Sequence, residues 1–286
     1  MRARPRDAAV GASTVRASTD PMVSAESSAA RSAPADRIAA GSEPAFRRLV
    51  ALAASRFRPA GRGPYYFARG KLGGDPVFAA LLRDGRITSD ARIVDIGCGL
   101  GILAALLAAA EQCDPRSASA WPQTWAPPPL GWTLRGFDLR MDAIATAQRA
   151  LFDIRDRVSL SIGDVRAVTL SECDVVVILD VLHYVDRVAQ RALLTNAYSA
   201  LAPGGTLLLR VADAAPNWRF RFTSAVDWWV TFARQKSWPQ LHWRPLAEWT
   251  ALLEAIGFSV VAQPMSEGTL FANVLLIATK RSPAEP

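Results

Sequence analysis

The stretch IVDIGCGLGIL, residues 93–103, constrains the fold more than any other part of the sequence. Its first residues, Ile93, Val94 and Ile96, form a short β-branched apolar run that is typical of a buried strand. Three glycines at every second position follow, and the apolar, alanine-rich residues after them favour a helix. The stretch therefore predicts a strand, a tight loop and a helix, in which the loop backbone can approach a ligand closely and helix N–H groups point at it.

Further apolar runs with strand character follow this stretch, and helical stretches lie between most of them. The runs are residues 132–137, 158–162, 175–179, 206–211, 258–262 and 270–278. Alternating strands and helices imply a mostly parallel sheet that is covered on both faces. The sequence therefore predicts an α/β, doubly wound, Rossmann-like fold with seven strands.

The composition divides the chain into three parts. Residues 1–43 are rich in Ala, Ser and Arg and lack periodic apolar positions, so we expect a disordered tail. Residues 44–90 are expected to form a helical lead-in, with one helix from Pro44 and another from Asp75. The stretch between these helices, residues 63–76, is expected to be too glycine-rich for a helix. The main domain is expected to span residues 91–286.

Two segments interrupt the alternation of strands and helices. Residues 114–131 are too proline-rich for regular structure and are expected to form a surface insertion. Residues 213–245 form a second insertion, rich in tryptophan, phenylalanine and basic residues. Its rings and charges suit an anionic, partly apolar or aromatic ligand, but tryptophans that complete the core would give the same pattern. The rings and charges are Trp218, Phe220, Phe222, Trp228, Trp229, Phe232, Trp238, Trp243, Arg219, Arg221, Arg234, Lys236 and Arg244.

Charge, cysteine content and hydropathy restrict the function classes. The formal net charge of +7 suits nucleic acid or an anionic membrane surface, but arginine-rich composition alone also produces such a charge. The three cysteines show no CxxC spacing, so neither a disulfide framework nor a metal site is expected. The longest apolar run, residues 100–110, is shorter than the roughly 20 residues that span a bilayer. A cytoplasmic protein without a transmembrane segment is expected.

The glycine loop and the residue before it carry a resemblance to a known family. Asp95 lies two places before Gly97, Gly99 and Gly101, and this arrangement resembles motif I of the class I S-adenosylmethionine-dependent methyltransferases. The dinucleotide fingerprint G-x-G-x-x-G would instead require glycine at Ile102. The resemblance implies S-adenosyl-L-methionine as the cofactor and argues against a nicotinamide-dependent oxidoreductase.

The same resemblance implies where the nucleoside part of the cofactor lies. Asp138, at the end of the second expected strand, would accept hydrogen bonds from both ribose hydroxyls, with Leu139 beside it. Because the first insertion lengthens the spacing before this strand, Asp142 is the alternative. Asp164 and Val165, after the third strand, would meet the adenine, although Asp164 can also simply cap a helix.

The fourth and fifth strands, in CDVVVILDVLHYV and LAPGGTLLLRV, are similar to later landmarks of the family. Asp180 would contact the methionine end of the cofactor or the acceptor, and it is also a candidate catalytic residue. His183 is the candidate base, or a packing residue at the strand end, with His242 as a second candidate. Arg69, or the nearby Lys71, would supply charge for the methionine carboxylate.

Two residues of the glycine loop have alternative interpretations. Asp95 either hydrogen-bonds the loop amides alone or also lies near the amino group of the cofactor. Cys98, which lies among the cofactor-contacting residues of the loop, is expected to be a small buried residue and not a nucleophile.

These expectations combine into one function and its rivals. The favoured function is methyl transfer to a small-molecule or carrier-linked metabolite, at oxygen, with an anionic acceptor that has an apolar or aromatic part. A nucleic-acid methyltransferase is disfavoured, because LDVL stands where an amino-methylating N/D-P-P-Y/F motif would be. A methyltransferase-like scaffold that binds cofactor or a partner without turnover remains the third possibility.

Overall fold

The computed structural model describes residues 44–113, 116, 120–214, 223–224, 240–266 and 272–282. The strands are β1 (Arg92–Ile96), β2 (Thr133–Asp138), β3 (Val158–Ile162), β4 (Cys173–Leu179), β5 (Leu201–Ala212), β6 (Phe258–Pro264) and β7 (Asn273–Lys280). The helices are α1 (Pro44–Ser55), α2 (Arg62–Gly74), α3 (Pro76–Arg83), α4 (Ile102–Glu111), α5 (Met141–Ala150), α6 (Arg187–Ala200) and α8 (Leu246–Ile256). Short 3-10 helices are η2 (Arg58–Ala60), η3 (Phe152–Ile154) and η4 (Leu182–Tyr184). Within these residues, no helix has the length and apolar character needed to span a bilayer.

The seven strands form one sheet in the order β3-β2-β1-β4-β5-β7-β6. The strands from β3 to β5 in this order pair in parallel, and β7 pairs antiparallel with both β5 and β6. The predicted doubly wound α/β fold is confirmed. The strand order reverses between β1 and β4, and ligands of such sheets bind beyond the carboxyl ends of the strands at this point.

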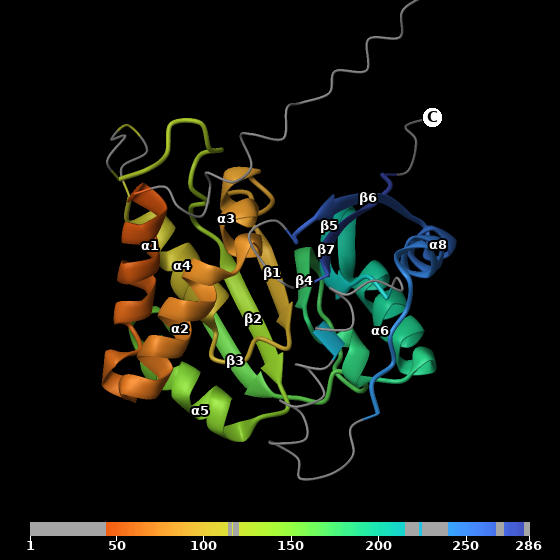
Figure 1. The fold of residues 1–286 in the computed structure, drawn as a ribbon, viewed down its shortest axis with the longest axis horizontal. Coiled ribbons are helices and arrows are strands. Elements are labelled where there is room, and N and C mark those ends of the chain that lie inside the picture. The colour runs from red at the N-terminus through yellow and green to blue at the C-terminus, as the bar shows by residue number, and fades with distance from the viewer. Residues whose placement is uncertain are drawn as a thin grey trace, which may run out of the picture. The chain divides into compact units, whose positions relative to one another are not determined.

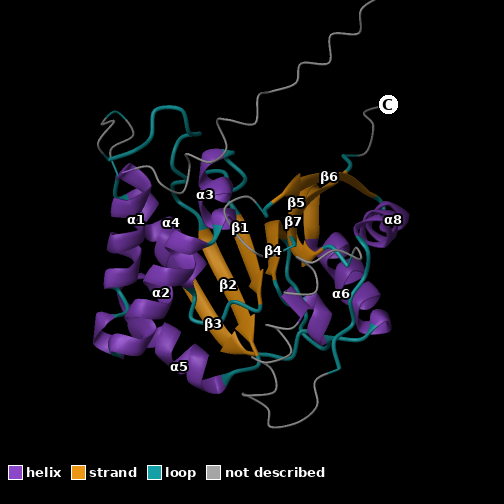
Figure 2. Cartoon of the chain, viewed as in Figure 1, coloured by secondary structure: helices purple, strands orange, loops and turns teal. Residues whose placement is uncertain are grey.

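Helices cover both faces of the sheet, as Figure 1 and Figure 2 show. Helices α1 to α5 share an apolar core with one face, to which Ile93 of β1 contributes. Helices α6 and α8 share the core of the other face, to which the next residue, Val94, contributes. This division follows from the alternation of side chains along a strand.

Helix α4 is buried along nearly its whole length, from Ile102 to Ala110. It belongs to the same core as the first sheet face and as Phe46 and Leu49 of α1. Helix α1 begins at Pro44, as predicted, although Leu52, which follows the apolar spacing, is 39% exposed. The neighbouring alanine, Ala53, is buried in its place, because the helix packs through its small residues.

The expectation that residues 63–76 are too glycine-rich for a helix is wrong, because α2 spans Arg62–Gly74. Ala68 and Leu72 lie one turn apart on α2, and both are fully buried. Pro64 falls in the first turn, where a missing N–H leaves no helix bond unmade. Burial of one side of the segment therefore outweighs its weak helix propensity.

The first insertion lacks regular structure in its described part, residues 120–131, as predicted. The expectation of a surface position is wrong for Trp121 and Trp125, which are 2% and 7% exposed. Trp125 packs against Phe46 of α1 with ring centroids 5.6 Å apart, and Trp121 Nε1 donates a hydrogen bond to Ala126 O. Prolines exclude helix and strand, but they do not prevent large rings from entering the core.

Candidate cofactor and acceptor site

The glycine loop connects β1 to α4 at the point where the strand order reverses. Gly97, Gly99 and Gly101 all have left-handed backbone angles, with φ of 78°, 56° and 69°. A Cβ on Gly97 would lie 2.2 Å from Cγ2 of Val181, the second residue after β4. The loops after β1 and β4 therefore touch, and glycine is required at this contact.

Asp138, the last residue of β2, is hydrogen-bonded to the glycine loop. Its Oδ2 accepts a hydrogen bond of 2.8 Å from Gly99 N, and its Oδ1 accepts one of 2.9 Å from Arg140 N. The backbone N–H groups of Gly97 and Cys98 donate to Phe137 O, just before it. The structure thus brings together two predicted site elements that are separated by the first insertion.

Asp142 is the alternative to Asp138 as the residue that would bind the ribose hydroxyls. It is exposed and lies in the first turn of α5, four residues beyond the end of β2. Cys98 is buried, and burial raises the pKa of its thiol, which therefore stays protonated. This agrees with the interpretation of Cys98 as a small buried residue.

Asp95 is a buried residue of β1, two residues before the first glycine of the loop. It is 5% exposed, and among the described residues no basic side chain pairs with it. Burial, with the charge of Asp138 as a smaller cause, raises the pKa of Asp95 to about 7. A buried acid beside a second acid is costly unless a cation joins it, which makes this position suited to a positively charged ligand.

Apolar side chains without cover lie at the ends of β2 and β3. Leu139 is 58% exposed and Ile162 is 55% exposed. Asp164 follows β3 and binds the guanidinium and backbone N–H of Arg166, which hold the pKa of Asp164 below its usual value. Val165 is buried in the core on the side of α6.

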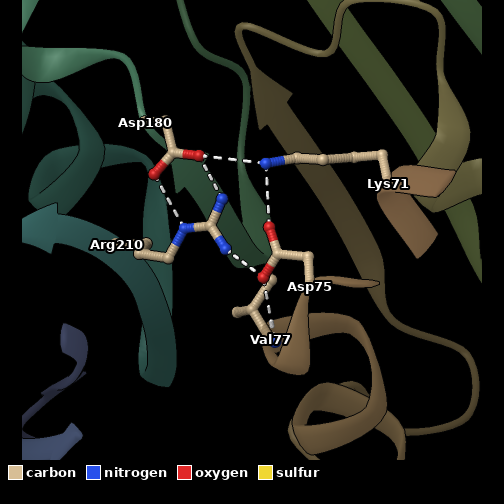
Figure 3. A network of polar contacts seen from close by, with 5 residues as sticks. All are labelled: Lys71, Asp75, Val77, Asp180 and Arg210. Carbon is tan, nitrogen blue, oxygen red and sulfur yellow. Dashed lines mark hydrogen bonds and ion pairs between the residues drawn. The ribbon is translucent and has the colours of Figure 1, made fainter. Parts of the chain in front are cut away.

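Figure 3 shows a network of charged side chains near the ends of β4 and β5. Arg210 of β5 is 1% exposed, and its guanidinium binds the carboxylates of Asp180 and Asp75. Lys71 of α2 reaches both carboxylates, at 2.8 Å from Asp75 and 3.4 Å from Asp180. Asp75 also caps α3, since it accepts a hydrogen bond from Val77 N.

Asp180 is held in an unusual position by this network. It has a left-handed φ of 59°, which few residues other than glycine adopt. Burial raises the pKa of Asp180, but the positive charges of Arg210 and Lys71 outweigh burial and hold it below its ordinary value. Asp180 is therefore an anchored carboxylate, which is not available as a base.

The sequence reasoning missed Asp75 and Arg210. Arg210 interrupts an otherwise apolar strand in TLLLRVA. Because a buried arginine requires carboxylate partners, this interruption is the sequence signal that could have found the network. Of the two predicted lead-in cations, Lys71 lies beside Asp180, whereas the guanidinium of Arg69 donates to the hydroxyl of Tyr65.

His183, in η4 after β4, is 7% exposed. Its ring stacks on that of Trp243, with centroids 4.4 Å apart and planes inclined by 11°. Burial lowers the pKa of His183 to about 4, although the charge of Asp180 opposes this shift. The imidazole is therefore neutral at pH 7 and is a weak base.

Gln190 of α6 joins the loop of His183 to the segment that carries Trp243. Its side-chain Nε2 donates to Leu182 O, Val185 O and His242 O, and its Oε1 accepts from Arg244 Nε at 2.6 Å. His242 N in turn donates to His183 O. Most of the predicted Trp-rich insertion lies outside the described residues. The hydrogen bonds of Gln190 and His242 hold the last part of the insertion beside His183.

A family model described as a methyltransferase domain matches residues 56–263 of the chain. A carboxy-S-adenosyl-L-methionine synthase from Chromohalobacter salexigens is 28% identical over 139 residues, which cover 48% of this chain and 46% of that protein. A highly reducing polyketide synthase from Alternaria alternata is 36% identical over 93 residues, which cover 32% of this chain and 4% of that protein. The chain thus spans less than half the length of these curated relatives.

Solved structures share the fold at low sequence identity. An O-methyltransferase family 2 protein from Planctomyces limnophilus, in complex with apigenin, superposes with a TM-score of 0.53 at 20% identity, over 79% of this chain and 61% of that one. The magnesium protoporphyrin IX methyltransferase of Synechocystis, with bound SAH, gives 0.51 at 17% identity, over 82% and 97%. Together with the family match, these findings show that the chain belongs to the methyltransferase domain family, as a class I S-adenosylmethionine-dependent member.

Proposed function

We propose that the protein transfers a methyl group from S-adenosylmethionine to an oxygen atom of a small-molecule or carrier-linked acceptor. The observation that carries this proposal is the junction of the glycine loop with Asp138, together with the buried carboxyl of Asp95, which no basic side chain of the described residues pairs with. Each of these features matches one chemical group of the cofactor.

The residues present fit this cofactor. The ammonium and sulfonium of S-adenosylmethionine supply the positive charge for which Asp95 has no basic partner among the described residues. Asp138 offers an ionisable acceptor for the ribose hydroxyls, next to the exposed Leu139 and Ile162 for the adenine ring. Lys71, beside Asp180, would hold the methionine carboxylate in preference to Arg69, which bonds Tyr65.

In this reaction the protein has two tasks: it positions the acceptor beside the cofactor, and it accepts the acceptor's proton. The bound cofactor supplies a sulfonium-activated methyl group, so the chain aligns the acceptor oxygen and excludes water. The neutral imidazole of His183 takes the acceptor's proton. Because a base with a pKa of about 4 is weak, the favoured acceptor is one that ionises readily, such as a carboxylic acid or a phenol made acidic by its substituents.

Calorimetry of cofactor binding tests the proposal first. We expect S-adenosylmethionine and its demethylated product to bind and NADH not to bind. Asp138→Asn should weaken binding of both at least about tenfold, because the ribose loses an ionised acceptor. Asp142→Asn is the matched control, since it makes the same change four residues away, and it should leave affinity unchanged. Binding of NADH alone, or loss only in the Asp142 variant, would contradict the assignment.

Turnover tests the role of His183. We expect His183→Gln to lower the rate of demethylated-product formation with phenolic acceptors about 100-fold, with unchanged affinity for S-adenosylmethionine. Because the pKa of His183 is about 4 and the base form persists above it, the wild-type rate should not fall through loss of this base between pH 8 and pH 5. Normal turnover of the variant would contradict the role of His183 as a base and would leave it as a residue that only packs at the end of the strand.

A further inference from the structure

One segment of the chain carries basic residues without any acidic ones. Residues 44–74 hold seven of the 33 Lys and Arg residues and none of the 26 Asp and Glu residues. The rest of the chain therefore carries 26 of each sign and no formal net charge. The segment that forms α1, η2 and α2 thus has a formal charge of +7.

Most of this charge faces outward. Arg56 pairs with Asp153, and Lys71 belongs to the network of Asp75 and Asp180. The other five basic residues are exposed, and so are two consecutive aromatic residues of α2, at 58% and 47%. We call these seven residues the basic flank: Arg47, Arg48, Arg58, Arg62, Arg69, Tyr66 and Phe67.

Two members of the basic flank contact Tyr65: the guanidinium of Arg58 lies 4.8 Å from the centroid of its ring, and Arg69 donates to its hydroxyl. Helix α1 reaches the core through Phe46 and Leu49, and α2 reaches it through Ala68 and Leu72, on the sides away from the flank. Burial of apolar surface stabilises these helices, whereas two exposed rings add nothing to that burial.

Glycines flank the two rings on α2. A Cβ built on Gly63 or Gly70 would meet nothing within 4 Å, and neither residue has a left-handed φ. The helix itself therefore does not require glycine at these positions. Between these glycines Tyr66 and Phe67 stay exposed, although the Tyr66 ring also contacts that of Tyr65.

We propose that the basic flank binds the anionic surface of a lipid bilayer, with Tyr66 and Phe67 at the level of the headgroups. Clusters of arginine are attracted to anionic lipids, and aromatic rings prefer the interface between water and hydrocarbon. A protein partner is usually selected by complementary charges of both signs, and the flank carries one sign only. The proposal is independent of the acceptor's identity.

Co-sedimentation with lipid vesicles tests the proposal on the full chain. We expect binding to vesicles of phosphatidylcholine mixed with phosphatidylglycerol, no binding to phosphatidylcholine alone, and weaker binding at high salt. Arg58→Gln/Arg62→Gln should weaken partitioning about 25-fold, at about fivefold for each arginine. Arg191→Gln/Arg281→Gln is the matched control, since it removes the same charge from exposed positions elsewhere and should leave partitioning near the wild-type value.

Two further measurements make the outcome decisive. The affinity for S-adenosylmethionine should be the same in both double variants, which shows that each is folded. Tyr66→Ser/Phe67→Ser should remove the part of vesicle binding that persists at high salt. The proposal would be overturned if the two double arginine variants lost vesicle binding equally, or if the wild type did not bind anionic vesicles. Binding to polyglutamate or to RNA without binding to vesicles would also overturn it.

Discussion

Arg210→Met is expected to lower the free energy of unfolding by about 3 to 5 kcal/mol, because it leaves two carboxylates without their buried cation. Arg210 is 1% exposed and binds Asp75 and Asp180. Methionine keeps the apolar volume of the side chain, so the change reports on charge. Urea unfolding followed by circular dichroism at pH 7 measures the effect.

Arg92→Met is the control for this prediction. Arg92 also binds two carboxylates, those of Asp174 and Glu172, but its side chain is 45% exposed. We expect a much smaller loss there, because water replaces the ion pair. Adding Asp180→Asn to Arg210→Met should recover part of the stability, since Lys71 then has to balance only one carboxylate, that of Asp75. Equal losses at Arg210 and Arg92 would refute the network's importance.

The stabilisation by this network also has a defined pH dependence. The pKa values of Asp75 and Asp180 are lowered in the folded protein, because the positive charges of Arg210 and Lys71 outweigh the effect of burial. Their contribution is therefore complete above the ordinary carboxyl pKa of 3.8 and is lost as the pH falls below it.

The affinity for S-adenosylmethionine is expected to rise about eightfold between pH 6.0 and pH 7.5, as Asp95 ionises with a pKa of about 7. The cationic end of the cofactor favours the carboxylate over the neutral acid, so binding releases a proton. Calorimetry in buffers of different ionisation enthalpy measures both the affinity and the proton release.

Asp95→Asn isolates this effect. Its affinity should be weaker and nearly independent of pH over the same range. Without cofactor, the wild type should lose stability as the pH rises from 3.8 to about 7, because the folded state retains a proton that the unfolded state releases. The variant should lack that loss. An unchanged pH dependence of affinity in the variant would separate Asp95 from the cofactor.

The glycine loop and the strands were readable from the sequence because their signals are local. Three alternating glycines after an apolar run leave few conformations open, and all three adopt left-handed angles. The mostly parallel, doubly wound sheet followed from the alternation of strands and helices, whereas the order of its strands is seen only in the structure. The fifth strand begins earlier than predicted, at Leu201, because that residue pairs with Cys173 before an irregular stretch.

The errors arose where long-range packing decided the outcome. Residues 63–76 have the composition of a loop, yet α2 forms because Ala68 and Leu72 are buried. The proline-rich insertion contributes Trp121 and Trp125 to the core. The local sequence pattern does not show that these side chains are buried, because the residues that cover them come from elsewhere in the chain.

The sequence by itself determined the strand, loop and helix around Gly97 and the carboxylates at the strand ends, because these depend on residue type and short spacing, and its resemblance to a family implied the cofactor. Only the tertiary structure decided how those carboxylates are used. It buries Asp95 where no basic side chain of the described residues pairs with it, anchors Asp180 through Arg210 and Lys71, and stacks the ring of His183 on that of Trp243. Charge partners and burial come from residues far apart in the chain, and they set each group's protonation and availability.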